Sequence, residues 1–399
     1  MTINNEHKKL NVPNLRFKEF QGEWEKCKLG DYGKVVTGNT PPTKDIENYE
    51  NGTYLWASPA DLGTIKLISE TKTMLSAKGF SKTRALPKGS VLVTCIGSTI
   101  GKTGMATKEM STNQQINSIV VNDNSDNEFV YYAIQSAFPR YLSSIAVLAV
   151  PIISKSAFEL LPNQRPCLQE QKKIGKMLSL LDERIATQNK IIDKLQSLIK
   201  GINQRVFKNS GTNYKLGEIC EIRSGYSGSQ HLSKKGLKVS RIETISGHKV
   251  NMERVGYVAP FESSENYRLR VGDILFSNIN SVEYIGNTAF IDKDYDLYHG
   301  MNLLRLTPNN MVVIPFYLYL LLNTNRMLNR FKTVCNKAVS QASINQTELG
   351  KTVVQIPPIN TQEQICELYQ ALYTKLEKVS HTKSLFQNQK QYLLRQMFI

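Results

Sequence analysis

The sequence has few cysteines and histidines, and neither residue type is clustered. Its six cysteines are scattered without a Cys-x-x-Cys pair, and the five histidines do not gather near them. This spacing disfavours both a disulfide framework and a zinc site. Long apolar runs are also missing, because the most apolar stretches, 144–153 and 311–322, fall short of the roughly 18 residues that a membrane span needs. The polar residues 1–9 resemble no secretory signal, so we expect a cytoplasmic protein without a membrane partner.

Acidic residues are also scarce relative to basic ones. The 399 residues include 50 Lys and Arg against 34 Asp and Glu, which gives a formal net charge of +16. The basic excess is spread along the whole chain and is not confined to a tail. Such a charge predicts a polyanionic partner, with nucleic acid as the main candidate. The length suggests two or three domains.

No catalytic pattern in the sequence is complete. Residues 97–103 resemble a phosphate-binding loop, but three residues separate the glycines where that motif needs four. Neither Pro-Pro pair has the flanking residues of a DNA methyltransferase loop. Asp61, Glu70 and Lys72 could form a degenerate metal-dependent nuclease site, an alternative that stays open. The sequence therefore favours a binding protein with no catalytic residue, no metal and no cofactor of its own.

The chain is a tandem repeat with a period of about 190 residues. Five short segments recur in the same order, with only small drift in their spacing. The paired segments are 28–31 with 215–218, 86–92 with 269–275, 100–103 with 285–288, Asn117 with Asn302, and the Gln-Glu-Gln runs 169–171 with 362–364. Chance similarity would not preserve this order. We therefore predict two related domains, each with short strands, Gly-rich turns and an apolar helical run (129–142 and 314–327).

A long helical pattern closes each copy. Steps of four and three residues from Ile174 to Val206, and again from Ile365 to Met397, place apolar residues at nine and eight of ten positions. A sustained period of 3.5 residues is typical of a coiled coil, here about 50 Å long. An antiparallel pair would place the polar Gln188 and Lys383 in one layer, whereas a parallel pair would set each against an apolar residue. We therefore predict antiparallel helices. The alternative is that each helix packs only on its own domain.

Several segments resemble the specificity (S) subunit of a type I restriction-modification system. They are residues 12–17, leading through Gly22-Glu23-Trp24 to Lys28-Leu29-Gly30, the turn 96–103, and the proline and Glu-Gln pair that precede each long helix. The duplicated layout extends this resemblance over the whole chain. It implies an α+β fold with two tandem duplicated α/β target recognition domains, separated by two long antiparallel coiled-coil helices.

The resemblance also implies a division of labour. Each domain would read one half of a split, asymmetric site in double-stranded DNA, while the helices set the spacer and bind two modification (M) methyltransferase subunits. Restriction (R) subunits would join that assembly, and S-adenosylmethionine, ATP and Mg would act on the partner subunits. The predicted segments are the first domain 1–165, the first helix 166–208, the second domain 209–357 and the second helix 358–399. A stand-alone DNA-binding regulator is the alternative of another class.

Loop residues able to bond phosphates or base edges are the candidate DNA contacts. In the first domain these are Thr37, Asn39, Thr40, Lys44, Ser58, Asp61, Thr99, Lys102, Gln114, Gln115, Ser154 and Lys155. In the second domain they are Ser224, Tyr226, Ser229, Gln230, Lys234, Lys235, Arg241, Glu243, Asn278, Asn280, Tyr284, Lys337, Ser340 and Gln341.

Overall fold

The computed structural model describes residues 11–145, 152–207, 211–230, 234–337 and 341–399. It divides into two compact units. The first unit comprises residues 1–190 and 379–399, and the second comprises residues 191–378. Each long helix begins in one unit and ends in the other. No helix in the described part of the chain is long and apolar enough to cross a membrane.

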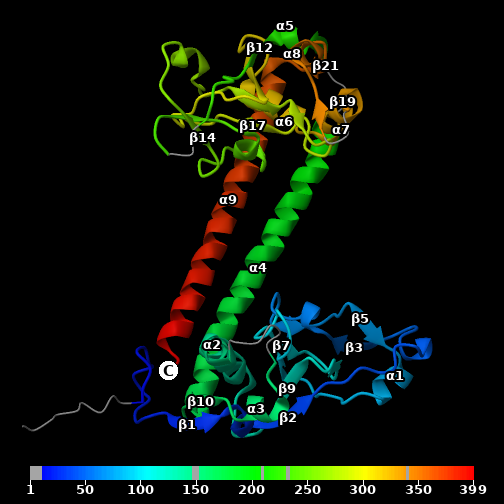
Figure 1. The fold of residues 1–399 in the computed structure, drawn as a ribbon, viewed down its shortest axis with the longest axis vertical. Helices are drawn as coiled ribbons and strands as arrows, with labels where there is room; N and C mark the ends of the chain where they lie inside the picture. Colours follow the sequence, from blue (N-terminus) through cyan, green and yellow to red (C-terminus); the bar gives the residue numbers. More distant parts are fainter. Residues whose placement is uncertain (1–10, 146–151, 208–210, 231–233, 338–340) are drawn as a thin grey trace, which may run out of the picture. The chain divides into compact units, whose positions relative to one another are not determined.

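A five-stranded sheet forms the centre of the first unit (Figure 1). Its strand order is β2 (Gly33–Thr37), β9 (Ile116–Val121), β6 (Val91–Thr94), β7 (Thr103–Ala106) and β4 (Leu67–Ile68). The β-branched residues that dominate β6 and β9 suit such a buried pleated surface. Helix α2 (Asn127–Ile145) contacts β6 and β7 and supplies much of the core.

Two smaller sheets complete the first unit. One has the order β5 (Thr73–Leu75), β3 (Tyr54–Ala57) and β8 (Ser111–Thr112), and the other pairs β1 (Glu25–Lys28) with β10 (Pro162–Arg165). The remaining elements are short helices: η1 (Leu29–Tyr32), η2 (Ile46–Asn48), η3 (Pro59–Asp61), α1 (Ala77–Ser81) and α3 (Lys155–Glu159).

The second unit repeats the central sheet with four strands. Their order is β12 (Cys220–Ser224), β18 (Leu303–Pro308), β15 (Ile274–Ser277) and β17 (Thr288–Phe290). Three smaller sheets have the orders β11 (Thr212–Lys215) with β21 (Val353–Ile356), β13 (Leu237–Val239) with β14 (Gly256–Val258), and β16 (Ile279–Asn280), β20 (Ala342–Ser343) and β19 (Asn336–Lys337). The helices are α5 (Leu216–Ile219), η4 (Ile242–Ile245), η5 (Ser264–Tyr267), α6 (Pro315–Leu322), α7 (Asn325–Val334) and α8 (Gln346–Gly350).

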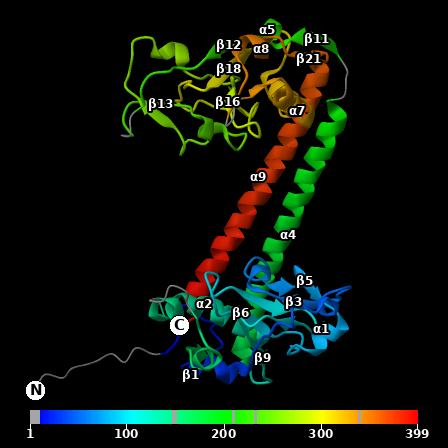
Figure 2. The same ribbon diagram turned by 45° about the vertical axis from the view of Figure 1, so that its right-hand side comes forward.

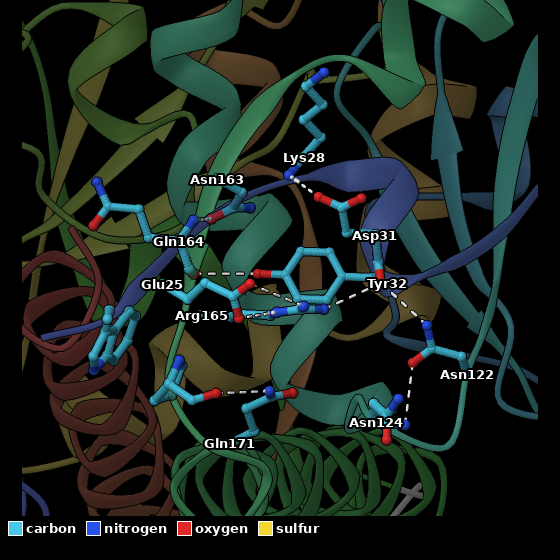
Figure 3. A network of polar contacts seen from close by, with 12 residues as sticks. Glu25, Lys28, Asp31, Tyr32, Asn122, Asn124, Asn163, Gln164, Arg165 and Gln171 are labelled. Carbon is cyan, nitrogen blue, oxygen red and sulfur yellow. Dashed lines mark hydrogen bonds and ion pairs between the residues drawn. The ribbon is translucent and has the colours of Figure 1, made fainter.

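The predicted duplication is confirmed at the level of single hydrogen bonds. In the first unit the Asp31 carboxylate accepts a bond from the Lys28 amide at 2.7 Å, and in the second Glu218 accepts one from the Lys215 amide at 2.8 Å. Figure 3 shows the first of these caps beside the β1–β10 pair, where Tyr32 donates to the Gln164 carbonyl. These bonds fix the turn that leads into β2 and β12, so both sheets start in the same way.

The hairpin that follows is also duplicated. The Thr94 amide donates to the Lys102 carbonyl at 2.8 Å, and the Ser277 amide donates to the Asn287 carbonyl at 2.8 Å. Gly101 in the first hairpin and Gly286 in the second both have a positive φ, near 90° and 84°. A Cβ at either glycine would clash with a phenylalanine of the following helical region. The segment that resembles a phosphate-binding loop is therefore a β-hairpin turn without a following helix.

Strand register and side-chain hydrogen bonds each correct one of the repeat pairings. Asn117 pairs with Val93 and Leu304 pairs with Phe276 in the corresponding sheets, so Asn117 matches Leu304 and not Asn302. Gln171 likewise matches Gln362, two residues earlier than the Gln-Glu-Gln alignment predicts. Both side chains are buried and donate to a proline carbonyl five residues earlier. The two copies differ slightly in loop length, and a sequence match cannot place such differences.

The predicted helical run 314–327 is two helices in the structure. Helix α6 ends at Leu322, and Thr324 caps α7 by accepting a bond from the Met327 amide. Threonine is a favoured N-cap residue because its hydroxyl satisfies an amide that lacks a helical partner. The first copy has an uninterrupted helix α2 in the same place.

The long helices are α4 (Leu168–Val206) and α9 (Ile359–Gln396), and they are antiparallel within each unit. In the first unit Lys390 Nζ donates to Asp182 Oδ1 at 2.6 Å, and Arg184 lies over the Phe386 ring. In the second unit the Tyr369 hydroxyl bonds to Asn203. These contacts confirm the predicted direction and agree with the register that places Gln188 level with Lys383.

The C-terminal residues close the core of the first unit. Leu393, Met397 and Phe398 join α2 and the first turns of α4 in one buried cluster, and Figures 1 and 2 show the end of α9 beside α2. The Phe398 ring stacks on Phe129 with centroids 5.4 Å apart. Trp24 belongs to the same cluster and contacts Phe398, so segments from both ends of the described chain form this core.

Replacing Phe398 with alanine is expected to destabilise the first unit by about 3–5 kcal/mol, because the change removes a buried ring and leaves a cavity. The matched control is Tyr392→Ala in helix α9, which ends just before Phe398; Tyr392 is 58% exposed. Chemical denaturation followed by tryptophan fluorescence measures the difference, since Trp24 packs on Phe398. Equal stability of the two variants would contradict this account of the core.

Candidate nucleic-acid interface

The central sheet of each unit has one edge where several loops meet. In the first unit β2 ends at Thr37, which pairs with Asn117 of β9, and β6 ends at Thr94, which pairs with Ile116 at the start of β9. Antiparallel pairing therefore brings the loop after β2, the hairpin turn after β6 and the loop before β9 together. The same order of strand ends recurs in the second unit at Ser224, Ser277 and Leu303.

Four predicted residues of the first unit, Thr37, Asn39, Thr40 and Gln114, lie in the loops at this edge. The Thr37 hydroxyl donates to Asn117 Oδ1 at 2.6 Å, and the Thr40 hydroxyl bonds to Gln114 Oε1. The Asn39 side chain is held between the Lys82 carbonyl and the Arg84 amide. The loops of this edge are thus held by hydrogen bonds between polar side chains and backbone groups.

Backbone hydrogen bonds link several other candidates of the first unit to the strand β6 end of this edge. Gln115 accepts a bond from the Cys95 amide through its carbonyl, which links it to the hairpin turn carrying Thr99 and Lys102. Ser154 caps α3 just after Ile153, whose amide donates to the Cys95 carbonyl. Of the other four candidates, Lys44 and Lys155 are exposed. Ser58 and Asp61 are half-buried at the two ends of the η3 turn.

Asp61 has a local structural role. Its Oδ2 accepts bonds from the Ser58 amide and hydroxyl at 2.8 Å each, and its Oδ1 accepts one from the Lys72 amide at 2.9 Å. These bonds cap η3 and use both oxygens of the carboxylate. Across the residues that the structure describes, no group of three His, Cys, Asp or Glu side chains is arranged to hold a metal ion. No observation thus favours the nuclease alternative.

Several candidates of the second unit lie in two clusters. Ser229, Gln230, Arg241 and Glu243 line one hollow, where Arg241 Nε donates to Gln230 Oε1 at 2.5 Å. The second cluster is the small β16–β20–β19 sheet. Asn280 lies on β16 and Lys337 on β19, and Gln341 directly precedes β20. Asn278 precedes this sheet, and its carbonyl accepts a bond from the Ile344 amide.

Other candidates of this unit stand apart from both clusters. Tyr226 stacks on Phe261 with ring centroids 4.0 Å apart, so one of its faces is covered. Ser224 lies at the end of β12, within 3.5 Å of Gln346. Tyr284 is 47% exposed in the hairpin turn, and Lys234 and Lys235 are exposed before β13. Ser340 lies outside the described residues.

The structure adds basic residues that loop patterns did not single out. Arg84 Nη1 donates to the Thr37 carbonyl at 2.7 Å, and Lys82 Nζ bonds to Asp45 and Asn48. The nearby Lys82 ammonium lowers the pKa of the Asp45 carboxyl. The short basic run Lys82-Thr83-Arg84 was the available signal in the sequence. In the second unit Arg223 and Arg305 lie side by side on β12 and β18.

Comparison with known proteins identifies the family of this duplicated architecture. A family model described as a type I restriction modification DNA specificity domain matches residues 21–197 and again residues 211–385. The chain belongs to this family. As a type I specificity protein it carries two DNA specificity domains in tandem, which confirms the predicted resemblance and fold class.

Individual relatives agree with this membership. A putative MjaX specificity subunit of Methanocaldococcus jannaschii is 37% identical over 188 residues, covering 46% of this chain and 44% of that relative. The alignment with this relative thus spans less than half of its length. The MjaVIII specificity subunit of the same organism is 24% identical over 400 residues, covering 90% of each chain.

Solved structures share the fold of this specificity protein. The S subunit of a type I restriction-modification system from M. genitalium has a TM-score of 0.65 at 17% identity, covering 97% of this chain and 99% of that chain. A chain from a structural study of complex assembly in a type I R-M system has a TM-score of 0.57 at 18% identity and covers 93% of this chain. At these identities the likeness establishes the architecture.

Proposed function

We propose that this chain is the DNA-recognition subunit of a type I restriction-modification complex. Its two specificity domains each read one half of a split, asymmetric target in double-stranded DNA. The observation that carries the proposal is the duplicated sheet edge, where polar and basic loops gather at the same strand ends in both units. Loops held on such a scaffold are the usual carriers of recognition residues.

Differences between the two edges support an asymmetric target. The first hairpin turn has the sequence Gly-Ser-Thr at 97–99, whereas the second has Asn-Ile-Asn-Ser-Val-Glu at 278–283. Side chains of different donor and acceptor character read different base edges. The candidate residues named from the sequence, together with Lys82 and Arg84, are the proposed contacts.

Partner subunits supply the chemistry in this proposal. Two M subunits bind the long helices and methylate adenine with S-adenosylmethionine, and R subunits add ATP- and Mg-dependent cleavage. The exposed apolar side chains of Leu180 and Leu198 on α4 and of Leu385 and Tyr392 on α9 support a role for the helices in subunit binding. The chain itself needs no cofactor for recognition.

Methylation mapping tests this proposal. The chain co-expressed with its cognate M subunit is expected to methylate adenine at one split sequence, and the purified chain alone is expected to methylate and cleave nothing. Sequencing that detects N6-methyladenine identifies the sites. Cleavage by the chain alone would favour the nuclease alternative. Tight specific binding without an M subunit, with no methylation in its presence, would favour a stand-alone regulator.

A further inference from the structure

Two arginines face each other across the central sheet of the second unit. Arg223 on β12 and Arg305 on β18 are direct cross-strand partners. The corresponding pair in the first unit is Val36 and Ser118. Like charges directly opposite one another destabilise a sheet. The pair is therefore a costly feature that the second copy has and the first copy lacks.

Arg305 is almost completely buried, with 8% of its surface exposed. Its Nη1 donates to the Arg268 carbonyl at 3.1 Å and its Nη2 donates to the Asn266 carbonyl at 3.2 Å. Its Nε is buried without a hydrogen-bond partner. Neither bond supplies a counter-charge, and a buried charge without one is costly. The protein thus buries this guanidinium but gives its Nε donor no hydrogen-bond acceptor and its charge no carboxylate partner.

Both arginines line two hollows in the surface of the second unit. Glu221, Glu265 and Asp273 are among the residues of the first hollow. The second hollow is the one considered below. Ser224, Ser263, Asn266, Tyr267, His299 and Gln346 form the rest of its wall, and no Asp or Glu is among the residues that line this second hollow. We call this feature the arginine hollow. Its walls can donate hydrogen bonds from several directions to one small anion.

The histidine of the arginine hollow adds no positive charge to that of the two arginines. His299 lies 2.9 Å from the Leu303 carbonyl through Nε2, and burial, with the nearby Arg305 charge, lowers its pKa to about 4. The imidazole is therefore neutral at physiological pH. Arg223 is paired with Glu221, which lies outside this lining, and its side chain is 51% exposed.

We propose that the arginine hollow binds a backbone phosphate of DNA and anchors the second half-site. This inference rests on the proposed function and adds a specific, asymmetric contact to it. A planar guanidinium fork matches phosphate oxygens, and a buried one binds an anion more strongly than an exposed one. Ser224 of the hollow leads directly into the Gly-rich loop 224–230, so a phosphate held here fixes that loop on the duplex. The first half-site lacks this anchor because Val36 and Ser118 replace the arginines.

A phosphodiester fits the arginine hollow better than an acidic side chain of another protein. The donors come from two strands and from the segment 263–267, and an ester phosphate offers acceptors in more directions than a carboxylate does. The hollow also adjoins the predicted DNA-reading edge through Ser224. Its occupant is therefore expected to belong to the same duplex that the loops read.

The test compares Arg223→Val with the control Lys249→Val in the full chain complexed with its M subunit. Arg223→Val introduces the residue of the first copy, and Lys249 is an exposed cation, likewise paired with a carboxylate, in the same unit. Arg223→Val is expected to weaken binding about tenfold on target and unrelated duplexes alike, and to reduce the salt slope of log K by about 1. The control is expected to bind like the parent.

A methylphosphonate scan of the second half-site locates the contact. Neutralising one phosphate is expected to weaken the parent complex, and to have no further effect on Arg223→Val. If no position shows this loss of additivity, or if Arg223→Val changes M-subunit binding and leaves the salt slope intact, the phosphate assignment is wrong. Absence of any sequence-specific binding by the parent complex would instead overturn the proposed function itself.

Discussion

Replacing residues 209–357 with the matching domain of a relative is expected to change one half of the DNA target and leave the other half and the spacer unchanged. The reason is that the candidate reading edge of the second unit is formed within that segment, at the ends of β12, β15 and β18. Mapping of methylated adenines in cells that express the chimera with its M subunit gives the new sequence directly. The expected effect is complete replacement of one half-site.

The junctions of this chimera need care, because the second unit's core crosses them. Ile199 and Ile202 of α4 and Tyr369 of α9 pack in that core, and Phe207 lies against Tyr317 with centroids 5.6 Å apart. A donor domain should therefore keep an aromatic residue at the position of Tyr317. The matched control is the reciprocal exchange of residues 1–165. If either chimera folds and changes both half-sites, the assignment of one domain to each half is contradicted.

The repeat and the helix pair could be predicted because both depend on sequence patterns that can be recognised before the fold is known. A 3.5-residue stripe fixes which side of each helix is apolar, and two stripes of equal length define a register. The bonds of Asp182 with Lys390 and of Asn203 with Tyr369 agree with that register. The turn that leads into the central sheet of each unit could also be predicted from the repeated sequence, and Asp31 and Glu218 cap it in the same way.

The details of the sheet edges could not be predicted from the sequence. Strand register shows that Leu304 of the second unit corresponds to Asn117 of the first. A shift of two residues keeps every side chain on the same face of the sheet, so the apolar pattern of the sequence cannot reveal it. The Arg223–Arg305 pair is visible only once that register is known. The bond from Arg84 to the Thr37 carbonyl joins residues from separate loops, whose conformations no local pattern specifies.

Lengthening both long helices by one heptad is expected to lengthen the DNA spacer by about three base pairs. Seven helical residues add about 10.5 Å, and a base pair occupies about 3.4 Å of the duplex axis. The insertions belong between Ile192 and Asp193 and between Lys378 and Val379, which are matched positions when the predicted antiparallel register, with which the contacts within each unit agree, is continued along both helices. One heptad keeps the apolar seam facing the partner helix to within about 20°.

Matched insertions should succeed where a single one fails, and this difference tests the helix pair as a spacer. On α4, 21 residues separate Asp182 from Asn203, and on α9, 21 residues separate Tyr369 from Lys390. A heptad in α4 alone would break that equality, so the contacts of one unit could form only at the expense of the other. We therefore expect the single insertion to lower thermal stability and abolish methylation. The double insertion should methylate a target with a longer spacer and unchanged halves, and methylation at the parental spacing would show that the helices do not set it.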